Sequence, residues 1–204
     1  LDLLRERMGL SLPLLDLFTH PTVAELAPVL VGLKRSDANR IEVAPVRPSY
    51  PLSPVQRRML ILGHDGGTEY DTPNVVELEG ELDVNRVRHA FQALVQRHEI
   101  LRTSIVSMDA EPRQVVTDTA HMDLEVTDAE MSQVGAALRG FMRPFQLDRP
   151  PLIRAGLLRL EARRQLLAVA MPHLVSDYTS DGILVRDFGA LYAGQALPEL
   201  RLQY

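Results

Sequence analysis

The sequence contains no cysteine. This absence excludes disulfide bonds, thiolate zinc sites and cysteine nucleophiles. No secretory signal pattern and no uninterrupted apolar run long enough to cross a bilayer are recognised in the sequence. We therefore expect a cytoplasmic protein without a membrane-spanning segment.

Several classes of functional site have no recognisable motif. The net charge is -5 and no basic stripe with interleaved aromatic residues occurs, so nucleic acid is not an expected partner. The histidines share no metal-ligand spacing, and neither a glycine-rich phosphate loop nor a nucleophile elbow is present. With 204 residues, 46% of them hydrophobic and 24% charged, the composition fits one medium globular domain with an appendage.

Residues 1–33 are predicted to form short helices, the first of which ends at Gly9. Thr22 and Glu25 have the spacing of a capping box, in which each side chain accepts a hydrogen bond from the other residue's backbone amide. A block of about thirty residues cannot bury an adequate core alone. We therefore expect this block to be part of a larger helical bundle.

Residues 34–50 differ in composition from the segments on either side. The stretch begins with charged and polar side chains, and Pro45, Pro48 and Pro51 are spaced closely around its end. Proline disfavours helix at its own position and at the residue before it. We predict a semi-rigid, extended linker that runs over the surface of the next domain.

Residues 51–204 have the mixed pattern of an α/β domain of the α+β kind. Amphipathic segments indicate helices, of which one opens with a capping box at Ser53–Gln56 and another with the capping pattern Thr127–Glu130. Alternating apolar segments indicate strands. The predicted helices cover residues 53–62, 84–99, 129–142 and 180–193. The predicted strands cover residues 74–79, 102–107, 114–117, 152–160 and 165–171.

Several segments of this block resemble motifs of the condensation domains of nonribosomal peptide synthetases. The first motif of that family is resembled by LSPVQRRML at 52–60, and its second, RHExLRT, by RHEILRT at 97–103. The approach to its third motif is resembled by PFQLD at 144–148 and PLIRA at 151–155. The first block, with LRERMG and then LFTHPTVAEL, is similar to the end of a peptidyl carrier domain.

The resemblance implies a domain order. Residues 1–33 would be the C-terminal part of a peptidyl carrier domain, 34–50 a linker, and 51–204 the N-terminal lobe of a condensation domain. The implied fold is a lobe similar to chloramphenicol acetyltransferase, with a mixed sheet, after a small helical carrier remnant. It also implies that the carrier serine lies upstream of Leu1 and that the second lobe follows Tyr204, so we expect a fragment.

The activity implied by the resemblance is peptide bond formation. An acyl group would pass from an upstream carrier-bound thioester to the amine of a downstream carrier-bound amino acid. The partners would be the upstream and downstream carrier domains together with the missing second lobe. The cofactor would be 4′-phosphopantetheine, attached to carrier domains at a serine that is not in this chain.

His173 is the predicted catalytic residue. The third motif of the family is HHxxxDG, and PHLVSDY at 172–178 aligns with it when Asp177 is the motif aspartate. His173 then holds the position of the second, catalytic histidine. Pro172 replaces the first histidine, and Tyr178 replaces the glycine. A neutral imidazole at the end of a strand could orient an attacking amine or accept its proton.

Asp177 is predicted to support the site and not to contact substrate. A carboxylate on the turn that leaves the strand could fix the local geometry through an arginine, with Arg102 as the first candidate and Arg97 as the second. A solvent-facing aspartate that caps the following helix is the simpler alternative. Capping and packing at a helix end explain His98 and Glu99.

Other functions stay open at this point. Heterocyclisation domains share Asp177 and Ser180 but have an aspartate where this chain has Pro172, and epimerisation is another activity of the superfamily. A function of a different class is a catalytically silent condensation-like domain that docks carrier domains or a partner enzyme such as an oxygenase. The altered third motif is the feature that favours this alternative.

Overall fold

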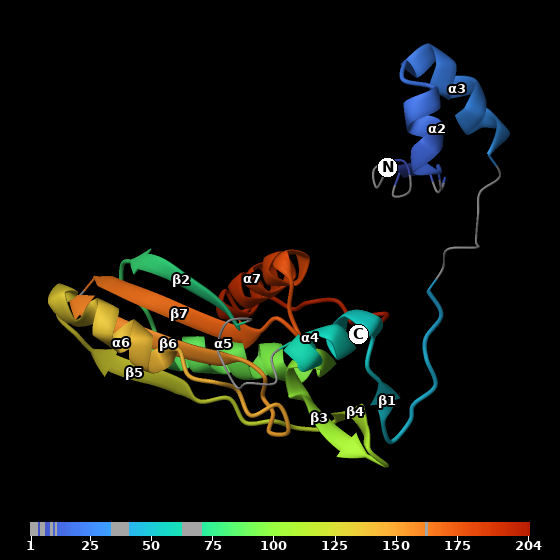
Figure 1. The fold of residues 1–204 in the computed structure, drawn as a ribbon. Coiled ribbons are helices and arrows are strands. Elements are labelled where there is room, and N and C mark those ends of the chain that lie inside the picture. The colour runs from blue at the N-terminus through green and yellow to red at the C-terminus, as the bar shows by residue number, and fades with distance from the viewer. Residues whose placement is uncertain are drawn as a thin grey trace. The chain divides into compact units, whose positions relative to one another are not determined.

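The computed structural model describes residues 4, 7–8, 10, 12–33, 41–62, 71–161 and 163–204. The chain divides into two compact units, Leu1–Pro45 and Val46–Tyr204 (Figure 1). In the part of the chain that is described, no helix is long and apolar enough to cross a membrane.

Two short helices of the first unit are described over their full length, α2 (Leu14–Thr19) and α3 (Val23–Gly32). The predicted capping box is confirmed, because Thr22 Oγ1 accepts from the amide of Glu25 at 3.3 Å and Glu25 Oε2 accepts from the amide of Thr22 at 3.2 Å. Neither helix contains a buried residue. The helix predicted before Gly9 falls largely outside the described residues.

The predicted linker is described only from residue 41 onward. Residues 41–49 form neither helix nor strand, and residues 34–40 lie outside the described part. The end of the predicted linker is a short strand, β1 (Tyr50–Pro51), which the sequence analysis missed. This strand pairs with residues 113 and 114 at the edge of a sheet, where a proline without an amide proton is tolerated.

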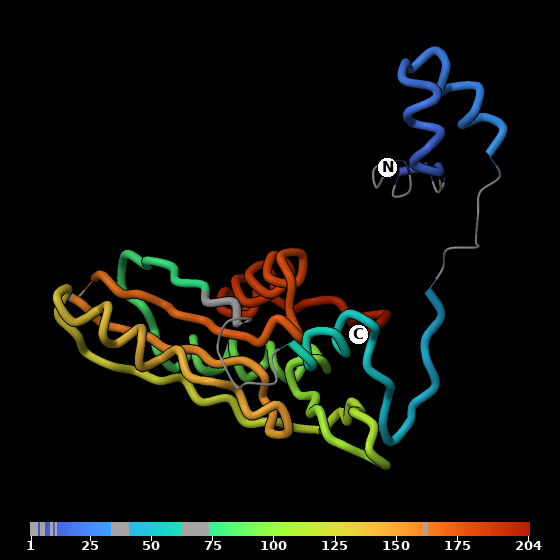
Figure 2. Tube along the Cα trace, viewed as in Figure 1, coloured from blue at the N-terminus to red at the C-terminus, as the bar shows by residue number. Residues whose placement is uncertain are grey.

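The second unit is built on two sheets. Its remaining strands are β2 (Asp71–Glu79), β3 (Thr103–Met108), β4 (Glu111–Val116), β5 (Leu124–Asp128), β6 (Arg154–Glu161) and β7 (Arg164–Pro172). The larger sheet has the order β2-β7-β6-β5 and the smaller one β1-β4-β3. The pair β5-β6 is parallel, whereas β7 is antiparallel to both of its neighbours. The larger sheet is therefore mixed, as predicted (Figure 2).

The described residues of this unit also form four α-helices. They are α4 (Pro54–Leu62), α5 (Val84–Arg97), α6 (Val134–Phe141) and α7 (Tyr178–Tyr192). Two short 3₁₀ segments, η2 (Glu99–Arg102) and η3 (Met131–Gln133), precede β3 and α6. The capping box predicted at the start of α4 is confirmed, since Ser53 and Gln56 exchange hydrogen bonds of 2.9 and 3.2 Å.

Strand β7 is buried on both faces. Leu167 and Met171 point into the main core, which also holds buried side chains of α5 and α7. Between them, Ala168 and Ala170 point to the other face and pack against Phe141 of α6. Helices α5 and α7 thus cover one face of the larger sheet and α6 covers the other. Burial of both apolar faces is the main favourable contribution to this arrangement.

Helices α5 and α7 also contact each other directly. The ring centroids of Phe91 and Phe188 are 4.5 Å apart, and those of Phe188 and Tyr192 are 6.2 Å apart. The guanidinium of Arg86 lies 4.8 Å from the centroid of the Tyr192 ring. Such aromatic and cation–π contacts add to the apolar burial and fix the relative position of the two helices.

Two predicted helices were wrong in extent. The helix expected over 84–99 ends at Arg97, because His98 adopts an extended conformation and its side chain turns toward α7. The helix expected over 129–142 consists of η3 followed by α6, and its capping box joins Glu130 to Gln133 instead of Thr127 to Glu130. In both regions a local pattern was overridden by contacts with distant residues.

One strand of the larger sheet was not predicted. Residues Leu124–Asp128 form β5, which pairs in parallel with β6. Parallel pairing joins segments far apart in the sequence, so no hairpin signal marks it. Strand β2 was predicted from residue 74 but begins at Asp71, because it pairs along the whole length of β7.

The close contact between β6 and α6 gives a test of this packing. A Cβ atom added to Gly156 would lie 2.9 Å from Cε2 of Phe141. We expect Gly156→Ala to lower the free energy of unfolding by about 1–3 kcal/mol, because the buried ring must shift. Gly140→Ala is the matched control, since that exposed α6 glycine has no atom within 4 Å of the added carbon. Urea unfolding of both variants measures the difference, and equal stabilities would contradict the packing described.

Candidate active site

His173 lies in the turn that follows β7, and its imidazole is half-buried. Its Nδ1 is 2.6 Å from the backbone oxygen of Ser176. Because a carbonyl only accepts hydrogen bonds, Nδ1 carries the proton of the neutral ring and Nε2 presents its lone pair. No described residue hydrogen-bonds Nε2. The fold therefore leaves Nε2 of the neutral imidazole available as a hydrogen-bond acceptor.

The imidazole lines a pocket of about 310 Å³. Helix α4 contributes Gln56 and Met59 to one wall, and the turn after β7 contributes Ser176 and Asp177 to the other. Such a mixed lining can hold a small polar group and keep part of the bulk water away.

A larger depression of about 740 Å³ lies at the opposite end of β7. Gln165 and Arg159 are among the residues that line it, and His173 is not. The pocket beside His173 is smaller, but it is the one that contains the predicted catalytic group. In the described ranges no group of three or more His, Asp or Glu side chains is placed to hold a metal ion.

Asp177 caps α7 and does not pair with an arginine. Its Oδ1 accepts from the amide and from the hydroxyl of Ser180, each at 2.7 Å. These hydrogen bonds hold the pKa of Asp177 below its ordinary value. The predicted Asp177–arginine pair is wrong, and the simpler helix-cap alternative is what the structure shows. A carboxylate at this position accepts hydrogen bonds from free amides of the first turn of the helix, so it needs no positively charged partner.

The two replacements in the third motif are accommodated locally. Tyr178 is the first residue of α7 and is 94% exposed, so its bulky side chain requires no space inside this unit. Pro172 is buried as the last residue of β7, opposite Asp71 in the sheet register. Neither replacement prevents His173 from reaching Ser176.

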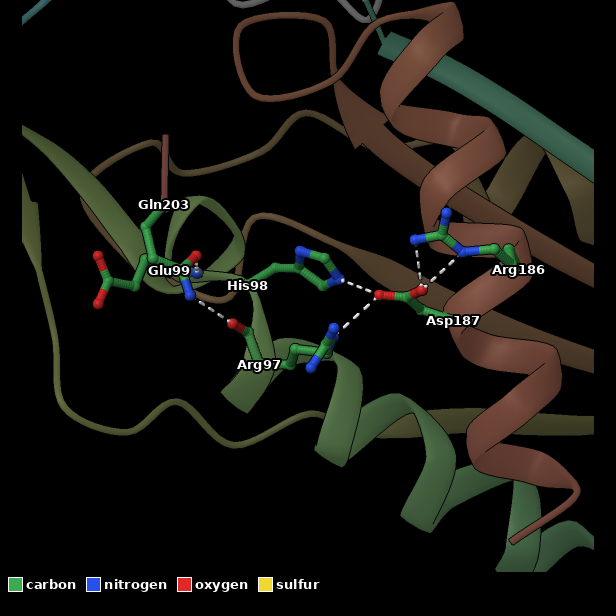
Figure 3. Close-up of polar contacts among 6 residues, drawn as sticks. All are labelled: Arg97, His98, Glu99, Arg186, Asp187 and Gln203. Atoms are coloured by element: carbon green, nitrogen blue, oxygen red, sulfur yellow. Dashed lines mark hydrogen bonds and ion pairs between the residues drawn. The ribbon is translucent and has the colours of Figure 1, made fainter. Parts of the chain in front are cut away.

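Arg97 and His98 converge on Asp187, a carboxylate of α7 that is 0% exposed (Figure 3). Its Oδ2 accepts from Arg97 Nε at 2.9 Å and from His98 Nε2 at 3.1 Å. Its Oδ1 accepts from Nε and Nη2 of Arg186 at 3.1 and 2.9 Å. We call these four residues the Asp187 cluster. The cluster ties the end of α5 to α7.

Opposing effects set the ionisation of the Asp187 cluster. Burial acts to raise the pKa of Asp187, but hydrogen bonds from Arg186, Arg97 and His98 outweigh it, and the pKa lies below its ordinary value. Burial is the largest single effect on the pKa of His98 and lowers it. The Asp187 carboxylate raises this pKa and the two arginines lower it, so that it lies below its ordinary value. His98 is therefore neutral at pH 7 and donates its Nε2 proton to a charged carboxylate.

Gln203 joins this region from the end of the chain. Its Oε1 accepts from the amide of Glu99 at 3.1 Å, and its Nε2 donates to the carbonyl of Arg97 at 2.9 Å. Figure 3 shows the amide lying against the turn that follows α5. This turn is thus held by Asp187 on one side and by Gln203 on the other.

Arg102 lies apart from both aspartates. Its Nη1 donates to the carbonyl of Thr117, and its Nη2 is 3.4 Å from Oε1 of Glu99. Its buried Nε has no partner among the described residues. Of the four predicted site residues, His173 and Asp177 share the turn after β7, whereas Arg97 and Arg102 serve other contacts.

The sequence analysis missed the structural roles of Asp187 and Gln56. Asp187 shares the apolar stripe of α7 with Leu184 and Leu191, at spacings of three and four residues. An aspartate in such a stripe indicates a buried, paired charge, so this signal was available. Gln56 was recognised only as part of a capping box, although its side chain is buried and bonds the backbone of Leu174.

The chain matches a known protein family over most of its length. The profile of the condensation domain family matches residues 46–204. The chain belongs to the condensation domain family. Among its relatives, surfactin synthase subunit 2 of Bacillus subtilis is 41% identical over 197 residues, which are 95% of this chain and 6% of that protein. Tyrocidine synthase 3 of Brevibacillus parabrevis is 38% identical over 209 residues, or 100% of this chain and 3% of that protein.

Solved structures of an X-domain and of a condensation domain share the fold. The X-domain from teicoplanin biosynthesis has a TM-score of 0.72 at 28% identity, over 79% of this chain and 37% of that one. The first condensation domain of the calcium-dependent antibiotic synthetase has a TM-score of 0.65 at 21% identity, over 75% and 41%. This condensation chain therefore spans less than half of those solved chains and a small part of the synthases.

The different environments of the two aspartates predict different losses of stability. Asp187→Ala leaves Arg97 without its buried partner, and we expect the free energy of unfolding to fall by about 3–5 kcal/mol. Asp177→Ala removes an exposed helix cap, for which about 0.5–2 kcal/mol is expected. Chemical unfolding of the two variants measures both losses. Equal losses, or a larger loss for Asp177→Ala, would contradict the assignment of the buried ion pair to Asp187.

The lowered pKa of His98 predicts a pH dependence of stability. Below about pH 6.5 the unfolded state takes up a proton that folded His98 resists, so the free energy of unfolding falls as the pH falls. Asp187 titrates at lower pH, below its ordinary value, and does not obscure this window. We expect His98→Gln to flatten the dependence between about pH 7 and 5. Replacing the exposed His121 by Gln is the control, and flattening by that variant instead would exclude His98 as the cause.

Proposed function

We propose that this condensation domain forms peptide bonds in nonribosomal peptide synthesis, with His173 as the catalytic residue. The observation that carries the proposal is the 2.6 Å contact between Nδ1 of His173 and the carbonyl of Ser176. It fixes the ring tautomer in which Nε2 accepts a proton or a hydrogen bond. The pocket beside the ring supplies room for a reacting amine.

The chemistry requires one proton transfer in each direction. The amine of the acceptor attacks the carbonyl carbon of the donor thioester, and Nε2 of His173 takes up the proton that the amine loses. When the C–S bond breaks, the leaving thiolate takes that proton from Nε2, and the ring of His173 returns to its neutral form. Ser176 accepts the Nδ1 hydrogen bond throughout and so holds the imidazole in place. Help of this kind contributes about 10²–10⁴-fold to a rate.

Both substrates would arrive on carrier domains. The 4′-phosphopantetheine arm belongs to the substrate in this scheme, and it presents the thioester carbonyl and the amine to the pocket. We infer from the carrier-like motifs that residues 1–33 are the end of an upstream carrier domain. Alignment of the two synthases with 95% and 100% of the chain, which includes this block, supports the inference. Residues 34–50 would be the linker and 51–204 the N-terminal lobe.

A docking module without catalytic activity is the second candidate. Two observations favour it: the third motif has Pro172 and Tyr178 at altered positions, and X-domains from teicoplanin biosynthesis are structurally similar at 28% identity. One of those structures is a complex of the X-domain with OxyB. In this alternative the exposed side chain of Tyr178 would be free to contact a partner enzyme.

Single-turnover condensation distinguishes the two candidates. The assay uses the complete synthetase segment with donor and acceptor carriers loaded. We expect His173→Ala to lower the rate by about 10²–10⁴-fold, because the proton acceptor is lost. Its thermal stability should change little, because the side chain is half-buried and its one hydrogen bond lies within the turn.

The matched control is His121→Ala, which replaces an exposed histidine outside the pocket and should leave the rate unchanged. Full turnover by His173→Ala would exclude the imidazole as the proton acceptor. Absence of turnover in the wild-type protein, with loaded carriers and an intact fold, would favour the docking module.

A further inference from the structure

Gln56 forms four hydrogen bonds while it is 2% exposed. Its side-chain Oε1 accepts from the backbone amide of Ser53 at 2.9 Å, and its backbone amide donates to the hydroxyl of Ser53 at 3.2 Å. Its Nε2 donates to Oε1 of Gln114 and to the carbonyl of Leu174, both at 3.2 Å. The side chain therefore joins α4, the smaller sheet and the turn after β7.

The contact with Leu174 is the one that bears on the site. Leu174 follows His173 directly, so its carbonyl lies inside the turn that carries the imidazole. The turn is also closed by the 2.9 Å bond from the amide of Val175 to the carbonyl of Pro172. The side chain of Gln56, which comes from α4, thus holds the backbone of the turn in place.

The opposite side of the turn is held by α7. Ser176 donates its hydroxyl to Oδ1 of Asp181 at 3.1 Å, and Asp177 caps the same helix. Ser176 also provides the carbonyl that accepts from His173. The position of this acceptor relative to the ring therefore depends on anchors that include Gln56 and the start of α7.

We propose that Gln56 is a positioning residue for His173, which acts by fixing the Leu174 carbonyl. This inference rests on the proposed function of His173. Without the Gln56 amide the turn loses its anchor on the α4 side, and the Nδ1 contact with Ser176 becomes less firmly positioned. Misplacement of a catalytic group by about 1 Å can cost about 10²-fold in rate.

The chain offers a matched control for this proposal in Gln114. Gln114 is 8% exposed, and its Nε2 donates to the carbonyl of Pro51 at 3.1 Å. It belongs to the same network but makes no contact with Leu174 that the structure shows. Gln114→Met and Gln56→Met both remove a buried amide at nearly constant size, so both should lower the melting temperature.

The rate of condensation separates the two variants. In single turnover with loaded carriers, we expect Gln56→Met to lower the rate constant about 10–100-fold with little change in the acceptor KM. Gln114→Met should retain the wild-type rate within about threefold, since the turn keeps its anchor. Gln56→Glu is a second variant, because it keeps the acceptor for Ser53 but removes the donor to Leu174. An equal loss of rate in Gln114→Met, or full activity in Gln56→Met, would overturn the proposal.

A double variant tests whether Gln56 acts through the imidazole. In a His173→Ala background we expect Gln56→Met to cause no further loss of rate, because the group that it positions is absent. A loss as large as in the wild-type background would show that Gln56 acts in another way and would overturn the proposal.

Hydrogen exchange provides a readout that does not depend on activity. The amide of Val175 should exchange faster in Gln56→Met than in Gln114→Met, because only the first variant releases the turn. If the wild-type protein does not condense its substrates, the proposed function fails, and this measurement still decides whether Gln56 holds the turn. Equal exchange in the two variants would overturn the positioning role.

Discussion

Strand β7 is the element on which the rest of the second unit depends. It pairs with β2 on one side and with β6 on the other, and it is buried on both faces. Helices α5 and α7 need one of those faces and α6 needs the other, so the layers meet at this strand. Strand β7 ends at Pro172, directly before His173. The position of the imidazole is therefore a consequence of sheet pairing, which the anchors of the turn then refine.

The turn after β7 is held by several hydrogen bonds and contains little buried charge. Its fixed points are neutral or solvent-facing: the Gln56 amide, the Ser176 carbonyl and the exposed Asp177 cap. The buried charge of the region is instead placed in the Asp187 cluster, away from the imidazole. This separation keeps the cost of desolvating a carboxylate in the contact between α5 and α7, where two arginines and a histidine compensate for it. In this chain, Arg97 and His98 of the second motif thus stabilise the contact between α5 and α7 and fix the position of these helices.

Much of the architecture could be predicted from the sequence because it follows from local signals. Capping boxes marked the starts of α3 and α4, and apolar alternation marked β6 and β7. Strand β5 and the end of α5 were missed or misplaced because they depend on distant partners. The partner of Asp177 was predicted wrongly for a related reason: the sequence does not show whether an arginine of another motif lies near the aspartate in space. Asp187 was the better candidate, since it lies in an apolar stripe where an unpaired charge would be costly.

The central claim is that the fold holds the neutral imidazole of His173 with its proton on Nδ1 and its lone pair on Nε2. Nitrogen-15 NMR of the complete condensation domain with labelled histidine tests this claim most directly, and His173→Gln identifies the signal. At a pH where the ring is neutral, the account predicts a protonated Nδ1 and an unprotonated Nε2, because Nδ1 donates to the carbonyl of Ser176. A spectrum with the proton on Nε2 would contradict it, because that ring could not accept a proton from the attacking amine at the pocket.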